Sequence, residues 1–136
     1  MILLDTNVMS ELMKATPHPA VERWFLFTAD ECALASIAIG ELAYGVAKLE
    51  EGVRKARLAS QVAEWRFHFA SRSHAFTMTT ALIYGEILGQ ARRAGRPMSV
   101  PDAQIAAIAT EQGCALATRN IQDFSTARLT LINPWS

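Results

Sequence analysis

Several features that often mark a protein class are scarce in this chain of 136 residues. Its two cysteines, Cys32 and Cys114, lie in apolar surroundings, as expected of small buried side chains and not of a disulfide framework or a metal pair. The longest apolar runs are a few residues, too short to span a membrane. No charged and apolar leader precedes the first expected strand, so secretion is unsupported. These absences favour a protein of the reducing cytoplasm.

Charge of one sign is also missing, because thirteen basic residues balance thirteen acidic ones. The overall charge therefore gives no reason to expect a nucleic-acid partner. The basic residues are nevertheless uneven, with Arg54, Lys55 and Arg57 in one cluster and Arg92, Arg93 and Arg96 in another. Such clusters are more often solvated helix faces than phosphate-binding sites.

The familiar catalytic motifs are absent as well. Gly85 and Gly89 lack the spacing of a phosphate-binding loop and follow no strand. No serine lies in a nucleophile-elbow context. The histidines, His18, His68 and His74, are more readily explained by surface or packing roles than by catalysis.

Apolar residues make up 51% of the chain, enough for one sizeable core, and residues 1–136 are expected to form a single domain. Short apolar segments alternate with longer segments of helical periodicity. This alternation predicts a three-layer α/β/α domain around a mainly parallel sheet of four to five strands. Strands are expected at residues 2–4, 32–35, 75–78, 114–118 and 129–132. Helices are expected near residues 8–14, 21–27, 37–49, 53–69, 80–94 and 100–112.

Polar residues predict where several of these helices begin. Ser36 is a candidate N-cap for the third helix, and Thr79 or Thr80 for the fifth. Residues 99–102, Ser-Val-Pro-Asp, form a strong helix start, with proline in the first turn. In the second helix, an aromatic face made of Trp24, Phe25 and Phe27 is expected to face the core rather than a partner protein.

Four acidic residues fall near the ends of the expected elements: Asp5, Glu41, Asp102 and Asp123. Asp5 follows the first buried strand, where open α/β sheets place their sites, but it could equally be the N-cap of the next helix. Asp123 follows the fourth strand and is expected near Asp5, because loops after parallel strands gather at one edge. Whether Asp102 faces that edge depends on the chain connection.

Simple structural roles explain some of these acids better than others. Asp102 in a first helical turn is favourable for dipole reasons alone, and Asp123 can be a turn or cap residue. Glu41 is least explained, because its neighbours are small or apolar and an unpaired carboxylate there is costly. Carboxylates brought together without histidine or cysteine suit Mg²⁺ or Mn²⁺ and not zinc.

Four segments resemble PIN domains, and more narrowly the VapC/FitB-type toxins of prokaryotic toxin–antitoxin pairs. They are residues 1–8 (Met-Ile-Leu-Leu-Asp-Thr-Asn-Val), 36–42, 101–109 and 117–124, and the ending Leu-Ile-Asn-Pro-Trp is also similar. Each motif alone is weak, but four in the same order over the whole chain are highly specific.

The resemblance implies a Mg²⁺- or Mn²⁺-dependent endoribonuclease, with a homodimeric state and a cognate antitoxin. It places the catalytic and metal-binding acids at Asp5, Glu41, Asp102 and Asp123, with Asp5 and Asp102 the best candidates for direct ligands. Supporting roles fall on Asn120, Thr6 and Thr118. RNA phosphates would be bound by Arg119 and then by the cluster of Arg92, Arg93 and Arg96.

Two other functions stay open on the sequence. One is a PIN-like module that binds RNA or protein without cleavage, which the complete set of acids disfavours. The other is a metal-dependent phosphatase, which is disfavoured because position 7 is asparagine where an acylphosphate mechanism needs a second carboxylate.

Overall fold

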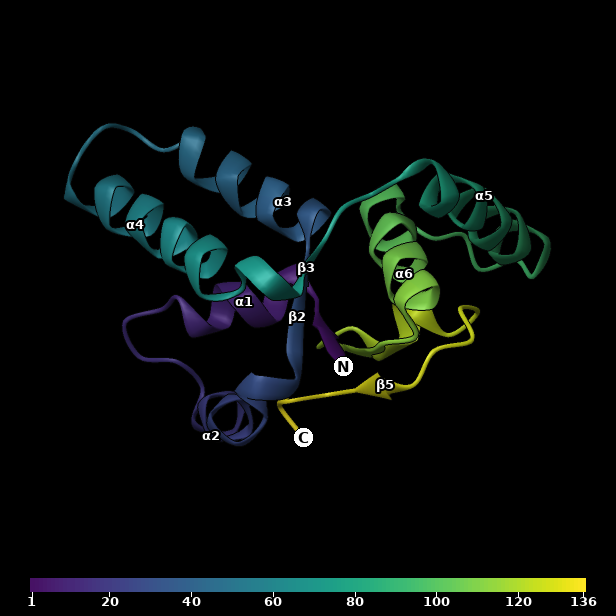
Figure 1. Ribbon diagram of the computed structural model, residues 1–136, viewed down its shortest axis with the longest axis horizontal. Coiled ribbons are helices and arrows are strands. Elements are labelled where there is room, and N and C mark those ends of the chain that lie inside the picture. The colour runs from purple at the N-terminus through teal and green to yellow at the C-terminus, as the bar shows by residue number, and fades with distance from the viewer.

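The computed structural model describes all residues from 1 to 136 and shows a single parallel sheet between helices (Figure 1). The strands are β1 (Ile2–Leu4), β2 (Cys32–Ala35), β3 (Ser73–His74), β4 (Ala115–Ala117) and β5 (Leu131–Ile132). The helices are α1 (Thr6–Leu12), α2 (Pro19–Thr28), α3 (Ser36–Ala47), α4 (Val53–His68), α5 (Met78–Arg93) and α6 (Val100–Gln112). Three short 3-10 helices, η1 (Ala29–Glu31), η2 (Ala70–Arg72) and η3 (Ile121–Phe124), complete the chain.

The first strand, β1, lies at the centre of the sheet. The five strands are ordered β3-β2-β1-β4-β5, and every neighbouring pair is parallel. Ile2 therefore pairs with Cys32 on one side and with Ala115 on the other. The predicted α/β/α class and the parallel sheet are confirmed, and the carboxyl ends of all five strands share one edge.

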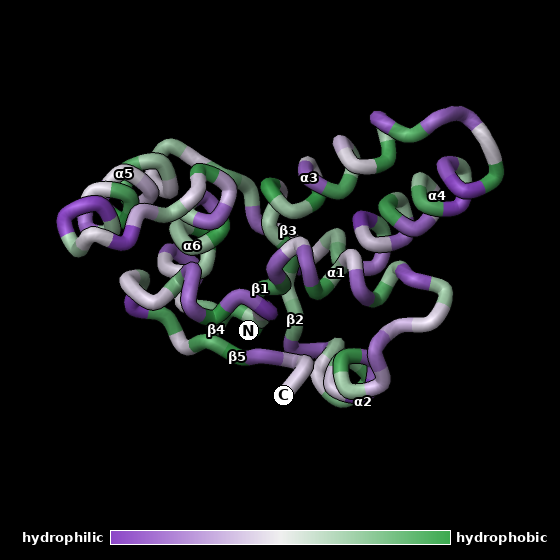
Figure 2. Tube along the Cα trace, turned by 180° about the vertical axis from the view of Figure 1, so that it is seen from behind, coloured by the Kyte–Doolittle hydropathy of each residue, from purple (hydrophilic) through white to green (hydrophobic).

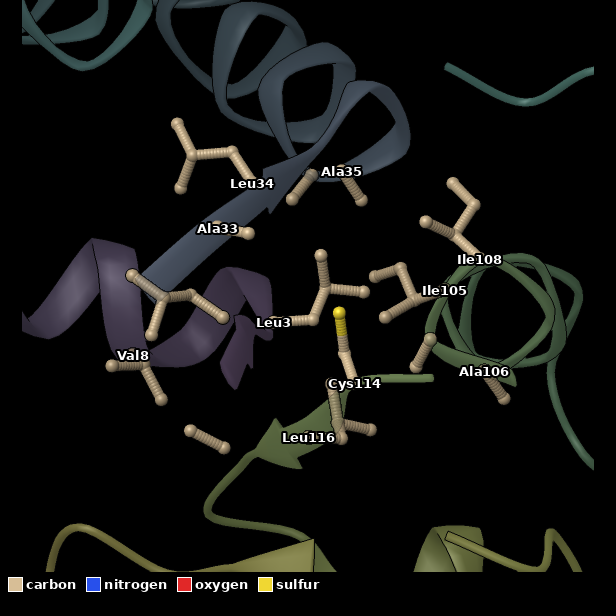
Figure 3. Close-up of a cluster of buried hydrophobic side chains, with 14 of the residues drawn as sticks. Leu3, Val8, Ala33, Leu34, Ala35, Ile105, Ala106, Ile108, Cys114 and Leu116 are labelled. Atoms are coloured by element: carbon tan, nitrogen blue, oxygen red, sulfur yellow. The ribbon is translucent and has the colours of Figure 1, made fainter. Parts of the chain in front are cut away.

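The core lies on both faces of β1. In Figure 1 the helices α1, α2 and α4 lie to one side of the strands, and α5 and α6 lie to the other. Figure 3 shows Leu3 pointing toward Ile105 of α6, while Val8 of α1 and Leu34 of β2 lie on the side away from α6. All four side chains are fully buried. Burial on both faces explains why the strands have continuous apolar sequences instead of alternating ones.

Several element boundaries differ from the expected ones. The first helix begins at Thr6, two residues early, because Asp5 is already its N-cap. Ser36 does not cap α3, because it is the first helical residue and Ala35 occupies the cap position. The fourth and fifth strands are also shorter than predicted, at 115–117 and 131–132.

The prediction of the third strand at 75–78 is wrong, because β3 comprises only Ser73–His74 and ends before the predicted range begins. The cause is a capping box at the start of α5. Thr77 accepts a hydrogen bond from the backbone N–H of Thr80, and the Thr80 hydroxyl accepts one from the backbone N–H of Thr77. Thr77 is thus the cap in place of Thr79 or Thr80. Thr77 and Met78, which were predicted to lie in the strand, belong instead to the start of α5.

The expected aromatic face of α2 is only partly correct. Phe25 packs edge-on against Trp65 of α4 with ring centroids 5.7 Å apart, and Trp24 also packs against the core. Phe27 is 83% exposed, because the inward face of α2 follows Val21, Trp24 and Phe25 and turns position 27 to the surface.

None of the helices combines the length and apolar character that crossing a bilayer requires.

Candidate active site

Asp5 lies where β1 ends and α1 begins, and only 5% of it is exposed. Its Oδ1 accepts a hydrogen bond of 2.8 Å from the backbone N–H of Thr6, the contact of a helix cap. Its Oδ2 accepts bonds from the Thr118 hydroxyl at 2.7 Å and from the Asn7 amide at 3.2 Å. Asp5 is therefore an N-cap and also the centre of a polar cluster at the sheet edge.

Burial raises the pKa of Asp5 from its ordinary value of 3.8 to about 6. The hydrogen bonds from Thr118 and Thr6 oppose this shift, whereas the negative charges of Asp102 and Glu41 add to it. The carboxylates at this edge are thus near enough to repel one another, which is the condition under which a cation would be bound.

Glu41 comes from α3, and its Oε1 accepts a hydrogen bond of 2.6 Å from the Thr6 hydroxyl. The expectation of apolar surroundings is wrong, because Gly40, Ala43 and Tyr44 are exposed and Glu41 itself is half-buried. Its carboxylate reaches the sheet edge from a part of α3 that is largely exposed to solvent.

Asp102 reaches the same edge from the first turn of α6. Helix α6 leads directly into β4, so the helix runs opposite to the strand and its N-terminus lies at the carboxyl edge. Ser99 caps this turn by accepting a hydrogen bond of 3.2 Å from the Asp102 N–H. Burial raises the pKa of Asp102, and the charges of Asp123 and Glu41 add to the effect against the opposing Ser99 hydroxyl.

A cavity of about 430 Å³ brings these groups together. Its lining includes three of the four predicted acids, Asp5, Glu41 and Asp102, together with Thr6, Asn120 and Arg119. Asp123 is exposed in η3 and does not line the cavity, although its charge acts on Asp102. The fully buried Thr118 lies beneath the lining and holds Asp5.

Five lining residues were not singled out as site residues from the sequence: Asn7, Ser10, Glu11, Lys14 and Trp135. Four of them, at positions 7, 10, 11 and 14, follow the i, i+3, i+4, i+7 pattern of one helix face, so one face of the segment that begins with α1 borders the cavity. This spacing was available once the helix was known to start at Thr6. Asn7 also joins α1 to the loop after β4, because its Oδ1 accepts a hydrogen bond of 3.3 Å from the Arg119 N–H.

The arginines expected to bind RNA divide between the cavity and the far end of the molecule. Arg119 lines the cavity, with its guanidinium 5.1 Å from the ring centre of Trp135. Lys14 lines it too, but its ammonium is paired with Glu11 at 3.0 Å. Arg92, Arg93 and Arg96 are exposed and do not line it. In Figure 2 the hydrophilic end of α5 lies at the opposite side of the molecule from α3 and α4.

The chemistry of the donors fits a hard divalent cation, because all the acids offer oxygen and no histidine or cysteine lines the cavity. No three acidic, histidine or cysteine side chains are grouped closely enough to hold an ion without other ligands. Mg²⁺ commonly keeps several waters and uses one or two carboxylates. The residues fit such an ion, with Asp5 as the most enclosed donor.

Comparison with known proteins shows to which family the chain belongs. The PIN domain family model matches residues 2–128. The chain belongs to the PIN domain family. The similarity extends over the whole chain in individual relatives. The plasmid stability protein StbB of Pseudomonas syringae pv. tomato is 39% identical over 99% of both chains. The VapC ribonuclease Y4jK of Sinorhizobium fredii is 36% identical over 99% of this chain and 98% of that one.

A third relative of this PIN domain is known both by sequence and by structure. Toxin FitB of Neisseria gonorrhoeae is 34% identical over 99% of both chains. The crystal structure of FitAcB from the same organism contains a chain that superposes with a TM-score of 0.92, again over 99% of both chains. Within its family, this PIN domain is therefore of the VapC/FitB type.

Proposed function

We propose that this PIN domain is a Mg²⁺- or Mn²⁺-dependent endoribonuclease and the toxin of a toxin–antitoxin pair. The observation that carries the proposal is the meeting of Asp5, Glu41 and Asp102 in one cavity at the sheet edge. These carboxylates come from the residue after β1, from α3 and from α6, so only the fold assembles them. Similarity to a protein named VapC ribonuclease, over nearly its whole length, supports the reaction class.

In this proposal Asp5 and Asp102 are the direct ligands, and Glu41 completes the site directly or through water. Asp123, which lies outside the cavity, contributes its charge. A divalent cation bound there would supply Lewis acidity and lower the pKa of a bound water. The side chains themselves have to stay ionised and correctly oriented. The Thr118 hydroxyl and the Thr6 N–H favour ionised Asp5 by donating hydrogen bonds to it.

The supporting residues hold these carboxylates in place. Thr6 links two acids, since its backbone N–H binds Asp5 and its hydroxyl binds Glu41. Thr118 donates to Asp5 and accepts hydrogen bonds from the Asn120 N–H at 3.1 Å and the Asn7 amide at 3.4 Å. The network fixes the loop after β4 against the start of α1, which limits movement of Asp5.

RNA would enter through the open side of the cavity. Arg119 is the basic side chain best placed for a phosphate there, because it forms no ion pair and stacks on Trp135. Proteins that cut RNA at chosen sequences usually take unpaired loops, whose bases can be splayed out. We therefore propose a structured RNA with an exposed loop as the substrate.

The proposal includes a cognate antitoxin and a homodimer. Support comes from FitB, the relative named as a toxin, and from apolar side chains left at the surface, such as Tyr44, Phe27 and Phe67. Light scattering at micromolar concentration tests the dimer, and a chain that stays monomeric would contradict it.

The function is tested by incubating the purified protein with total RNA in Mn²⁺ or in EDTA and mapping the cut ends. Defined cuts that need the metal and disappear in Asp5→Asn support the proposal. Binding without cuts would point to a non-catalytic module. Release of phosphate from small esters would point to a phosphatase. That mechanism needs a second carboxylate at position 7, where the chain has Asn7, whose side-chain amide donates to Thr118.

A further inference from the structure

A second groove lies between α1, α3 and α4 and continues from the cavity that Asp5, Glu41 and Asp102 line, here called the acid cavity. It has a volume of about 440 Å³ and shares four lining residues with the acid cavity: Thr6, Ser10, Lys14 and Glu41. Figure 1 shows α3 and α4 side by side, with α1 below them. The two hollows are therefore neighbouring parts of one surface depression, and Glu41 borders both.

The lining of this second groove contains two arginines of α4, Arg54 and Arg57. Both are exposed, and neither forms an ion pair, since the salt bridges of the chain are Lys14–Glu11 and Lys55–Glu51. Their positions, three residues apart, place them on the same helix face. Two uncompensated positive charges thus border a groove that begins at the carboxylates.

Arg57 is also held toward the groove. Its Nη1 donates to the backbone carbonyl of Met13 at 3.5 Å and to the Gln61 side chain at 3.4 Å. Both acceptors are neutral, so they orient the guanidinium from α4 toward α1 without cancelling its charge. A guanidinium oriented in this way suits phosphate, which it can bind through several N–H groups.

We infer that this groove binds the phosphate backbone of the RNA beside the scissile bond, with Arg54 and Arg57 as the phosphate-binding residues. The inference rests on the proposed function and gives the substrate a path across α4. A phosphodiester strand that enters the acid cavity has repulsive carboxylates ahead of it. Cationic side chains next to them hold its neighbouring phosphates and offset that repulsion.

This placement differs from the one that the sequence suggested. Arg92, Arg93 and Arg96 were expected to bind phosphate after Arg119, but they lie at the end of α5 and just after it, away from α3 and α4 (Figure 2). Arg54 and Arg57 were noted only as a basic cluster, and the fold brings them to the groove next to Glu41.

The test measures the affinity of an Asp5→Asn protein for a short fluorescent single-stranded oligouridylate across a range of salt concentrations. Arg54→Gln/Arg57→Gln is compared with Arg23→Gln/Arg66→Gln, a matched double variant of exposed arginines that line neither the cavity nor the groove. Each phosphate contact on single strands contributes about 0.7 to the slope of log affinity against log salt. The groove variant is expected to lower the slope by about 1.4, and the matched variant to leave it unchanged.

A third protein, Arg92→Gln/Arg93→Gln, separates the two basic clusters. Equal slopes for the groove variant and the matched variant overturn the inference, as does a loss of slope confined to the α5 variant. Thermal melting of each variant shows whether folding is retained. The single variant Arg54→Gln serves as a second control, because the hydrogen bonds to Met13 and Gln61 belong to Arg57 and are kept. It is expected to lower the slope of log affinity against log salt by about 0.7. If the wild-type protein neither cuts nor binds RNA, the proposed function fails with the inference. If it cuts RNA and the groove variant keeps the full slope, only the inference fails.

Discussion

The acid that directly follows β1 and the acids carried by the helices occupy different environments. Asp5 is 5% exposed and accepts hydrogen bonds from Thr6, Asn7 and Thr118. Glu41 and Asp102 are half-buried, and Glu41 accepts one hydrogen bond, from Thr6. Asp123 is exposed, and its charge raises the pKa of Asp102.

The decrease in burial from Asp5 to Asp123 indicates that the acids differ in how firmly they are held. Asp5 is fixed by the sheet itself, because its backbone N–H donates to the Ala117 carbonyl at 2.9 Å. The helix-borne acids reach in from elements that pack on the sheet, and their side chains retain more freedom. The rigid acid is therefore expected to carry the largest effects on activity and stability, and the exposed acid the smallest.

The largest expected effect is on catalysis by Asp5→Asn. Loss of a supporting partner of a metal ligand typically costs about 10- to 100-fold, so loss of the most enclosed ligand should cost about 100-fold or more. Metal-dependent cleavage of a defined RNA, measured by initial rates, checks this value. Full activity in a preparation free of contaminating nuclease would remove Asp5 from the site.

The next effect concerns the pH dependence of stability in EDTA. The pKa of Asp5 is near 3.8 unfolded and about 6 folded, so the folded state holds the proton in between. Stability relative to Asp5→Asn is then highest below pH 3.8 and falls by about 3 kcal/mol as the pH rises through 6. Urea unfolding of both proteins at several pH values measures the difference. Parallel curves would show that burial of Asp5 does not perturb its pKa.

Thr118→Val and Thr6→Val separate the support given by the fully buried Thr118 hydroxyl from that given by the half-buried Thr6 hydroxyl. Thr118→Val leaves Asp5 without its shortest hydrogen bond in a fully buried place, which should reduce the free energy of unfolding by about 1 to 3 kcal/mol. The pKa of Asp5 should rise further, because the Thr118 hydroxyl lowers it. Thr6→Val serves as the control and should cost about 1 kcal/mol, since Glu41 can still reach solvent. An equal loss in both variants would contradict the distinction.

The smallest expected effect is that of Asp123→Asn. Its side chain lines no part of the acid cavity, so the cleavage rate should fall less than about tenfold. The pKa of Asp102 should fall, because Asp123 is the larger of the two charges that raise it. NMR titration of the Asp102 carboxyl measures that change. A hundredfold loss of activity would instead make Asp123 equal to Asp5.

Local rules of the sequence account for much of the fold. The apolar segments at 2–4 and 32–35 are strands as predicted, and the Ser99 start of α6 is confirmed by its cap. The errors lie where side chains compete for the backbone, as at Thr77, whose capping box shortens the third strand. Such competition depends on hydrogen-bond geometry, which apolar periodicity does not report.

The sequence by itself determined the order of strands and helices and which acids stand at their ends, because both follow from contacts between residues near in the chain. Only the tertiary structure decided that Asp5, Glu41 and Asp102 share one cavity while Asp123 lies outside it. It also decided that Arg54 and Arg57 border the adjoining groove and that the α5 arginines do not. These relations join residues up to about a hundred positions apart. They depend on the parallel pairing of β1 with β4 and on the packing of α1, α3 and α4, which no local pattern encodes.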